Sequence, residues 1–554
     1  MGIAALNLVK GLAVSVILYA STAIVLFTLL RKLLKNVPVS VPFICTLLFI
    51  AHPVHTEVVA NIKSGDELLC FLFFIASAVY FLAFIDTGKK TSLIFSVAFF
   101  FLSLLSKESG LTFLAVFPLL AYFFRGKGLK ESLTKSMAFL IPAIVFLLLH
   151  QHVISHAGSP PIEYTYHDNS LVAAPNAMSR LATAIYINGD YLLLLLFPLK
   201  FSSDYSFNQI QPVTFMNVQV ILTIAFAVWM VYFIFKKFKS RNEFVFVMLF
   251  YLITISLVSN IILLIGATKA DRFLYTPSIA FTLFLGMAGH RYLKRNHWYA
   301  VVFVLFAFYS MKTIARNADW KNNLTLFQQD VKTAARSANT HYNYGIMYMD
   351  SVAMKAKDPE LKKQLLQTSL NEFSEAVRID SLSEDAYKEL GRCYFHLEDY
   401  SRSIENLLRS LKLNPNDLSI YGDLGNAYFR NENFNEAIEA LNKSVAAGFA
   451  TGDSYNFLGS AYFKIGDYPS AIIQFNKSLE KHPDDDAVLI NLGSAYGSVN
   501  DFEKAISAFN KSLQVNPFNE RAYQYLGLIY EEMGNKEKAT ENFSKANQLT
   551  TDPR

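Results

Sequence analysis

Ionisable residues in this 554-residue chain gather in five short clusters, each at the edge of a long apolar run. The clusters are HPVHTEVVANIKSGDELL (52–69), SKESG (106–110), FPLKFSSDYS (197–206), GATKADRFLYTPS (266–278) and RNADW (316–320). Ionisable groups close to a membrane core are costly, so they tend to mark functional sites. The carboxylates suit general-base chemistry, and the cations suit an anionic leaving group. We therefore predict one site built from the five clusters.

The predicted site contains four candidate bases and two candidate phosphate-binding cations. The candidate bases are Glu57, Asp66, Glu108 and Asp204, with Asp66 first because it opens an apolar run beside two histidines. Lys269 and Arg272 precede a predicted helix start, where cations and backbone N–H groups together suit a phosphate. Snorkelling of both cations to lipid headgroups is the alternative. The other residues expected to line the site are His52, His55, Glu67 and Asp271.

Two of the clusters also have a purely structural interpretation. The spacing of His52, His55 and Glu57 is similar to that of metal ligands, but Pro53 keeps the histidines off one regular helix. Interfacial hydrogen bonding is therefore favoured over zinc, and no metal or other cofactor is predicted. Lys107 next to Glu108 has a self-neutralising ion pair as its alternative. The sequence contains no P-loop, dinucleotide-binding fingerprint, nucleophile elbow or HExxH motif.

The composition divides the chain into an apolar part and a polar part. The whole chain is 53% hydrophobic and only 17% charged. Up to Arg316 it contains 12 acidic residues, against 33 afterwards, so the net charges of the two parts are +13 and −8. A long, acid-poor and Phe-rich part is typical of membrane proteins and excludes a purely soluble protein. No Lys/Arg block with interleaved aromatic residues indicates nucleic acid as a partner.

Ten apolar runs bounded by charges are predicted to cross the bilayer, which takes about 17–25 residues per helix. They are 3–30, 37–51, 67–85, 91–106, 110–124, 136–155, 214–235, 243–266, 273–290 and 297–313. A further run, 181–197, is interrupted by Asn188, Gly189 and Asp190, and is expected to lie at the interface. Every second loop is basic, which places these loops in the cytoplasm. The five clusters and everything after Thr313 then face the lumen or periplasm, in an endoplasmic reticulum or bacterial inner membrane.

A 34-residue period appears in the polar part. Gly391, Gly425, Gly459, Gly493 and Gly527 are spaced at this interval, which is that of tetratricopeptide repeats. Gly345 begins one more repeat, lengthened by 12 residues around 354–366. We therefore predict an all-α chain with a polytopic membrane domain (1–313), a connector (314–340) and a tetratricopeptide-repeat solenoid (341–554).

The first helices of such repeats line a concave face. Here that face is expected to include Asn343, Arg392, Asn426, Asn456 and Asn491. Amide side chains suit hydrogen bonds to the backbone of an extended peptide, so an acceptor or partner protein is predicted to bind there. Ordinary solvated positions are the alternative.

The five clusters in this order, followed by the repeats, resemble the transmembrane-and-tetratricopeptide-repeat proteins, which are similar to protein O-mannosyltransferases and other GT-C glycosyltransferases. The resemblance implies transfer of a sugar from a polyprenyl-phosphate donor, dolichyl-phosphate-mannose in eukaryotes, to Ser or Thr of a protein. It also implies that Arg272 contacts the donor phosphate and that Asp204 and Tyr205 shape the site.

Two departures from the family pattern leave two interpretations: the chain is an N-terminally shortened version, or it has lost catalysis. The chain begins at what looks like the family's second helix, so the usual acidic first loop has no counterpart here. Gly65 stands before Asp66, where the family commonly has Arg. The alternative to a transferase is therefore an inactive membrane-anchored repeat scaffold for protein–protein interaction. A transporter is disfavoured because no mid-membrane charges or inverted repeat appear.

Overall fold

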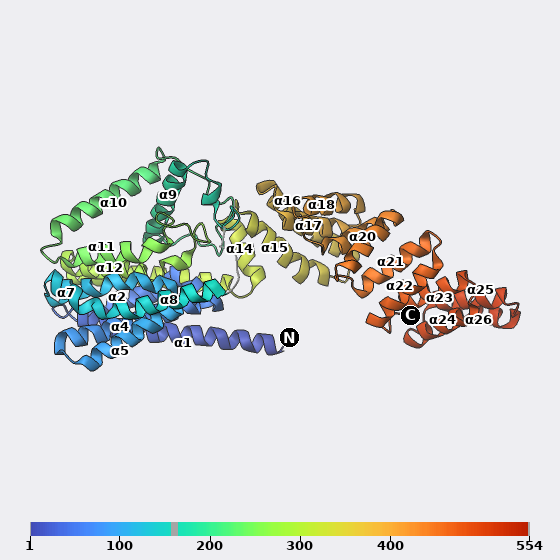
Figure 1. Cartoon of the computed structure of the whole chain (residues 1–554), viewed down its shortest axis with the longest axis horizontal. Coiled ribbons are helices and arrows are strands. Elements are labelled where there is room, and N and C mark those ends of the chain that lie inside the picture. Colours follow the sequence, from blue (N-terminus) through green and yellow to red (C-terminus); the bar gives the residue numbers. More distant parts are fainter. Residues whose placement is uncertain (1, 157–163, 552–554) are drawn as a thin grey trace. The chain divides into compact units, whose positions relative to one another are not determined.

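The computed structural model describes residues 2–156 and 164–551, and these contain helices but no strand. The chain forms two compact units, Met1–Tyr344 and Gly345–Arg554. The first unit is the apolar one and the second contains the repeats. The all-α fold expected from the sequence is confirmed, and each unit is described by itself (Figure 1).

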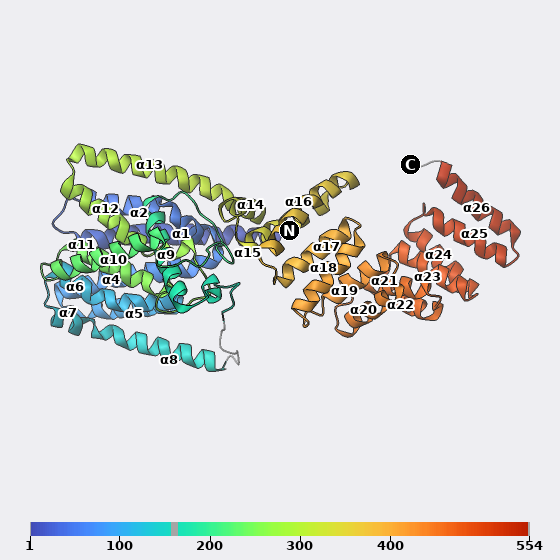
Figure 2. The same cartoon turned by 90° about the horizontal axis from the view of Figure 1, so that it is seen from above.

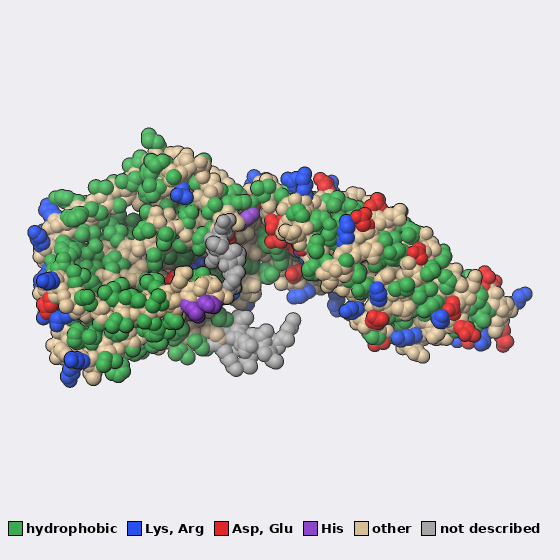
Figure 3. All heavy atoms as spheres, in the orientation of Figure 1, with side chains coloured by type: hydrophobic (Ala, Val, Ile, Leu, Met, Phe, Trp, Pro, Cys, Tyr) green, Lys and Arg blue, Asp and Glu red, His purple; other side chains and the backbone are tan. Residues whose placement is uncertain are grey.

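The first unit is a bundle of apolar helices joined by short connections. Its α-helices are α1 (Gly2–Leu33), α2 (Ser40–Ala51), α3 (Thr56–Ala60), α4 (Gly65–Thr87), α5 (Lys90–Ser106), α6 (Val116–Arg125), α7 (Leu129–Ser136), α8 (Leu140–His156), α9 (Ala177–Leu196), α10 (Val218–Lys237), α11 (Glu243–Ile255), α12 (Ser278–Tyr292), α13 (Arg295–Asp319) and α14 (Asn323–Thr333). Aromatic rings join α4, α6 and the 3-10 turn Met137–Phe139 before α8: Phe81 meets Phe117 edge-on, and the Phe117 and Phe139 rings stack with their centroids 3.7 Å apart. Hydrophobic side chains cover the flanks of this unit (Figure 3).

Five described helices are long and apolar enough to cross a membrane. They are Gly11–Leu33, Ile62–Thr87, Leu129–His156, Val218–Lys237 and Arg295–Asp319. The pair Ser40–Ala51 and Pro53–Ala60, bent by 52°, brings the number to six if it forms one span. The chain is therefore a multi-pass membrane protein. The predicted runs 91–106 and 273–290 correspond to the shorter helices α5 and α12.

Two of the predicted spans are wrong as continuous α-helices. The run 110–124 begins as a 3-10 helix, Glu108–Ala115, and becomes α6 only at Val116. Pro118 has no backbone N–H to donate to the preceding turn, which disfavours an α-helix through that turn. The run 243–266 ends as an α-helix at Ile255, because the side chains of Ser256 and Ser259 bond to nearby carbonyls and Asn260 takes a left-handed conformation (φ 56°).

Helix α9 runs across the direction of most other helices in the unit (Figures 1 and 2). It contains the run 181–197, which was expected to lie at the interface, and it is not among the helices apolar enough to cross. Its Asp190 accepts a hydrogen bond of 2.7 Å from Gln219 on α10. A helix in this orientation brings its polar residues toward the loops between the spans.

The predicted cytoplasmic loops meet at one end of the first unit, here called the basic end. Asp86 at the end of α4 forms ion pairs with Lys35 (3.1 Å) and Arg125 (2.6 Å). Arg241 donates to the carbonyl of Lys127 at 3.0 Å. Lys and Arg gather at this end in the space-filling view (Figure 3). Loops that are far apart in the sequence are thus joined at one end of the unit, as expected if every second loop lies on the same side of the membrane.

The second unit is a series of helix pairs. These are α15 (Ala338–Ser351) with α16 (Pro359–Ile379), α17 (Glu384–His396) with α18 (Tyr400–Leu413), α19 (Ile420–Arg430) with α20 (Phe434–Ala446), α21 (Gly452–Lys464) with α22 (Tyr468–Lys481), α23 (Asp486–Ser498) with α24 (Phe502–Val515), and α25 (Glu520–Glu532) with α26 (Lys536–Thr551). The predicted tetratricopeptide solenoid is therefore confirmed.

The periodic glycines let the two helices of each pair approach closely. A Cβ on Gly493 would lie 2.6 Å from the Phe509 ring, and one on Gly425 would lie 2.5 Å from Leu441. The large residue follows its glycine by 16 positions in these pairs. Gly345 instead meets Phe373, because the 12 extra residues lengthen the connection and the start of α16. The insertion therefore preserves the packing rule of the repeats.

Candidate functional site

The five polar clusters predicted from the sequence are joined by hydrogen bonds and ion pairs in the first unit, at the end opposite the basic end. Glu57 pairs with Arg272, which links the first cluster to the fourth, and Lys107 pairs with Asp66 and Glu67. Asp271 accepts from Ser202, and Ser203 in turn donates to Asp330 beside Arg316. We call this end of the unit the site end.

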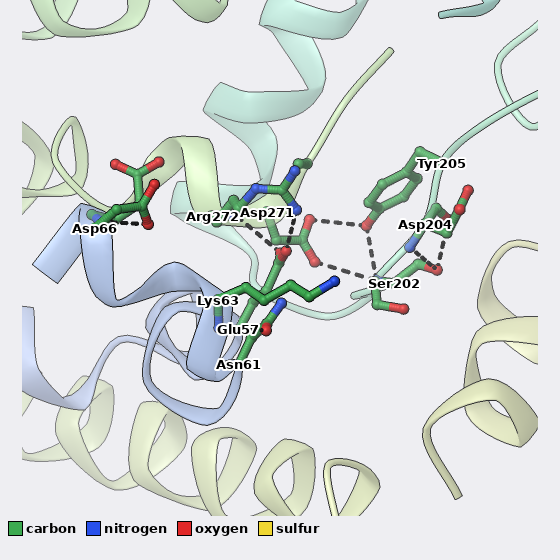
Figure 4. Close-up of polar contacts among 12 residues, drawn as sticks. Glu57, Asn61, Lys63, Asp66, Ser202, Asp204, Tyr205, Asp271 and Arg272 are labelled. Atoms are coloured by element: carbon green, nitrogen blue, oxygen red, sulfur yellow. Dashed lines mark hydrogen bonds and ion pairs between the residues drawn. The ribbon is translucent and has the colours of Figure 1, made fainter. Parts of the chain in front are cut away.

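Glu57 and Arg272 form the central ion pair of the site end (Figure 4). The bend at Pro53 starts a new short helix, α3, and places Glu57 in its first turn. The Arg272 Nη1 lies 2.6 Å from Glu57 Oε1, and the Arg272 backbone N–H donates to Oε2 at 3.0 Å. Glu57 is only 5% exposed, whereas the Arg272 side chain is 32% exposed. Glu57 therefore holds one edge of the guanidinium, the Phe273 ring lies 5.2 Å from its centre, and about a third of the side chain stays exposed.

Asp271, next to Arg272, is buried among hydrogen-bond donors. Its carboxylate accepts from the Tyr205 hydroxyl at 3.0 Å and from the Ser202 backbone N–H at 3.2 Å (Figure 4). Burial raises the pKa of Asp271 to about 7, against the opposing effect of Lys269. Asp271 thus fixes the 197–206 segment against the loop that contains Arg272.

Lys269 is buried in a cage of one carboxylate and two aromatic rings. Its Nζ lies 3.4 Å from Asp190 Oδ2 and 4.5 Å from the centroid of the Tyr205 ring. The Tyr191 ring lies 5.9 Å away on α9. The charge of Lys269 is therefore already balanced, and Lys269 is less accessible than Arg272.

Lys107 bridges two carboxylates on α4 and does not pair with its neighbour Glu108. Its Nζ lies 2.8 Å from Asp66 and 2.8 Å from Glu67. Burial lowers the pKa of Lys107, but the Glu67 and Asp66 carboxylates outweigh burial and hold it above its usual range. Glu108 is exposed at the start of its 3-10 helix. The ion pair between Lys107 and Glu108 considered from the sequence is therefore wrong, because Lys107 pairs with Asp66 and Glu67 instead.

Both predicted histidines are buried, and each makes hydrogen bonds within the protein. His52 Nδ1 accepts from the Val54 backbone N–H (3.3 Å), so its Nε2 donates to the Leu195 carbonyl at 3.1 Å. His55 lies between the Tyr19 hydroxyl (2.7 Å) and the Ser278 hydroxyl (2.8 Å). These contacts hold the bent α2–α3 segment in place, and they match the hydrogen-bonding interpretation of this motif.

Asp204 faces a different set of groups from its neighbour Tyr205. Its Oδ1 accepts from the Ser206 backbone N–H at 2.6 Å, and the Ser337 and Asn339 side chains donate to its carboxylate at 3.4 Å each. It therefore connects the site end to the segment between α14 and α15, whereas Tyr205 contacts Asp271 directly.

Sequence reasoning missed three charged residues at this end. Asp190, the partner of Lys269, was treated as an interruption of an apolar run. Asp330 is fully buried, 3.5 Å from Arg316, in what was predicted to be a connector. Lys63 is exposed, and its side chain extends past Glu57 in the direction of Ser202 (Figure 4). Only Lys63 had a sequence signal, because it lies inside the first cluster.

The second unit contains the other predicted binding surface. Asn456 and Asn491 line a hollow of about 850 Å³, and Arg392 and Asn426 line a smaller one of about 380 Å³. Asn343 is half-buried on the part of α15 that belongs to the first unit. Four of the five predicted positions thus face hollows formed by the first helices of the repeats.

Comparison with protein families gives matches in both units. Residues 157–231 match the family model described as "Protein O-mannosyl-transferase TMTC, DUF1736". Tetratricopeptide-repeat models match residues 384–417, 423–486, 487–519 and 520–552. The chain is a TMTC-like protein with membrane helices and tetratricopeptide repeats.

Relatives of this TMTC-like chain are about a quarter identical to it over the matched segments. Mouse (Mus musculus) "Protein O-mannosyl-transferase TMTC1" is 26% identical over 226 residues, covering 38% of this chain and 24% of the relative. Mouse TMTC3 is 23% identical over 363 residues, covering 58% of this chain and 38% of the relative. The matched segments thus span well under half of these relatives.

Among solved structures, the crystal structure of MamA is similar to part of this TMTC-like chain. It is 30% identical, with a TM-score of 0.28, and the match covers 29% of this chain and 95% of that one.

Proposed function

We propose that this TMTC-like chain is a membrane glycosyltransferase that moves a sugar, mannose, from a polyprenyl-phosphate donor to Ser or Thr of a protein. The observation that carries the proposal is the Glu57–Arg272 pair, which joins the first and fourth clusters and leaves about a third of the Arg272 side chain exposed. The names of the distant relatives, protein O-mannosyl-transferases, support the same reaction class.

The site end supplies cations for the donor phosphate. Glu57 holds one edge of the Arg272 guanidinium, and the exposed part of the side chain is available to a phosphate oxygen. Lys63 is exposed nearby and adds a second mobile cation. Lys269 contributes a longer-range positive charge from its cage. This arrangement stabilises the phosphate that leaves when the bond from the sugar to the donor breaks.

The acceptor hydroxyl needs a base as its oxygen bonds to the anomeric carbon of the sugar. Asp66 is the candidate that combines access with a cation partner, because its side chain is 39% exposed and pairs with Lys107 at 2.8 Å. Glu57 and Asp271 are occupied by several donors each, Glu108 is exposed outside these pairs, and Asp204 faces Ser337. In the proposed step the proton passes to Asp66 and the polyprenyl phosphate departs as an anion.

The sidedness of the reaction follows from the loop charges. Because basic loops stay in the cytoplasm, the opposite site end faces the lumen of the endoplasmic reticulum or the bacterial periplasm. Helix α13 ends at the site end, where Arg316 contacts Asp330, and we propose that the segment after it lies on the same side of the membrane, where the repeats bind the acceptor protein.

A second function, an inactive membrane-anchored scaffold, is favoured by one observation. Both predicted phosphate-binding cations already have a carboxylate partner, Glu57 for Arg272 and Asp190 for Lys269. In a scaffold, such pairs would serve only to connect the loops.

Donor binding and transfer distinguish the two functions. The full chain in detergent is titrated with a polyprenyl-phosphate-mannose and then assayed for mannose transfer to a Ser/Thr-containing peptide. We expect saturable donor binding that Arg272→Gln weakens by about tenfold or more, since a hydrogen bond to a charged group contributes about 1.5–3 kcal/mol. Unchanged binding in Arg272→Gln together with no transfer would leave the scaffold as the function.

A further inference from the structure

The hollow of about 850 Å³ in the second unit is lined by basic side chains, although the repeats around it are acidic. It is lined by the first helices α19, α21, α23 and α25, and we call it the repeat groove. Residues 420–530 contain 13 acidic and 8 basic side chains, so this part of the chain is acidic overall. The groove, however, is lined by Arg430, Lys464 and Arg521 and by no Asp or Glu. Such a reversal concentrates positive potential where a ligand would lie.

The three groove cations are not neutralised by neighbouring carboxylates. No ion pair joins Arg430, Lys464 or Arg521 to a described residue, and all three are exposed. In the smaller hollow, by contrast, Arg392 is held by Asp423 (2.7 Å) and Glu389 (2.9 Å). The repeat groove therefore has charges available for a ligand, whereas those of the smaller hollow are used within the protein.

Aromatic and amide side chains complete the repeat groove. The Phe429 and Phe457 rings lie 5.4 Å apart between centroids, and the Arg430 guanidinium lies 5.5 Å from the Phe457 ring. Asn491 donates to Asn456 Oδ1 at 3.1 Å. This bond leaves the Asn456 amide nitrogen and the Asn491 carbonyl oxygen for a peptide backbone, which has one acceptor and one donor per residue.

We infer that the repeat groove binds an extended, acidic protein segment with aromatic side chains. Its carboxylates face Arg430, Lys464 and Arg521, its rings pack on Phe429 and Phe457, and its backbone bonds to the two asparagines. This inference deepens the acceptor-binding part of the proposed function by naming the chemistry of the acceptor. It concerns binding alone, so its test is separate from any test of transfer.

The test measures the affinity of the full chain, in detergent, for a dye-labelled peptide of alternating Glu and Phe by fluorescence anisotropy. The triple variant Arg430→Gln, Lys464→Gln, Arg521→Gln removes the groove charges. The matched control is Lys443→Gln, Lys477→Gln, Lys511→Gln, which makes the same charge change at three second-helix positions spaced by the repeat period. None of these three control residues lines the groove.

We expect the groove variant to bind about threefold or more weakly, because three exposed charge contacts are lost together, and the control to bind as the native chain does. Added salt should weaken native binding, and a Lys/Phe peptide should not bind. A double variant, Asn456→Ala with Asn491→Ala, should lower the affinity by about threefold or more through the lost backbone bonds.

Three results would overturn the inference. The first is that the groove variant binds the peptide as tightly as the native chain does. The second is that the control triple weakens peptide binding as much as the groove triple does. The third is that heparin binds as tightly as the peptide, which would make the groove a general polyanion surface. If mannose transfer fails while peptide binding still depends on the groove charges and on salt, the transferase proposal is refuted and the inference about the repeat groove is not.

Discussion

Cations at the site end and cations in the repeat groove are arranged in opposite ways. At the site end Arg272, Lys269 and Lys107 each touch a carboxylate, and all three are at least partly buried. In the groove Arg430, Lys464 and Arg521 line an open hollow without carboxylates. Charges close to an apolar domain need internal partners to be tolerated, whereas charges on a solvated solenoid do not. The cations available to a ligand are therefore those that stay exposed without a carboxylate partner in the groove, and the exposed part of Arg272 at the site end.

The largest expected difference between the two regions is in stability. Arg272→Ala leaves the buried Glu57 carboxylate without its charge partner, which should cost about 2–4 kcal/mol after allowance for the partial exposure of Arg272. Arg430→Ala removes an exposed side chain and should change stability by no more than about 0.5 kcal/mol. Thermal unfolding of both variants in the same detergent checks this, and equal melting temperatures would contradict the contrast.

The next expected effect concerns the packing of the repeats. Gly493→Ala puts a methyl group 2.6 Å from the Phe509 ring and should cost about 1–3 kcal/mol through overpacking. Gly422→Ala on α19 meets only an ordinary contact of 3.4 Å and should be neutral or slightly stabilising. Circular-dichroism melts of the full chain compare the two. A neutral Gly493→Ala would mean that the close helix approach is not the reason for the 34-residue glycine period.

A smaller effect is expected in the pH dependence of stability. The pKa of Asp271 is raised to about 7 by burial, so the folded chain keeps this proton over a range where the unfolded chain has lost it. The Asp271 contribution to stability is therefore full below about pH 4 and is lost as the pH rises toward 7. Asp271→Asn should flatten this part of the profile relative to the native chain. Parallel profiles for the two proteins would show that Asp271 is ionised when folded.

The sequence predicted the elements of both regions but not the pairs within them. The 34-residue period fixes which glycines meet which large residues, because those contacts lie within one repeat. Glu57 and Arg272 are 215 residues apart, and only the folded bundle brings them together. Composition placed both residues in clusters near the membrane, and the resemblance assigned a role to Arg272.

The errors in the predicted spans have a local origin. Hydropathy measures how apolar a run is and does not register the effect of Pro118 on the first turn of α6 or of Asn260 after α11. The side-chain hydrogen bonds of Ser259 and Asn260 end a helix that apolar composition alone would extend. Asp190 was predicted to interrupt a run, but its partner Lys269 lies 79 residues away.

Steady-state mannose transfer by the full chain, with a polyprenyl-phosphate-mannose as donor and a Ser/Thr-containing acidic protein as acceptor, tests the division of labour between the two regions most directly. We predict that Arg272→Gln lowers transfer by about tenfold or more at limiting donor, because it weakens donor binding. The groove triple variant should raise KM for the acidic acceptor by about threefold or more with little change in kcat. The second-helix lysine triple should transfer as the native chain does. Normal transfer by Arg272→Gln, or a fall in kcat with unchanged KM in the groove variant, would contradict the account.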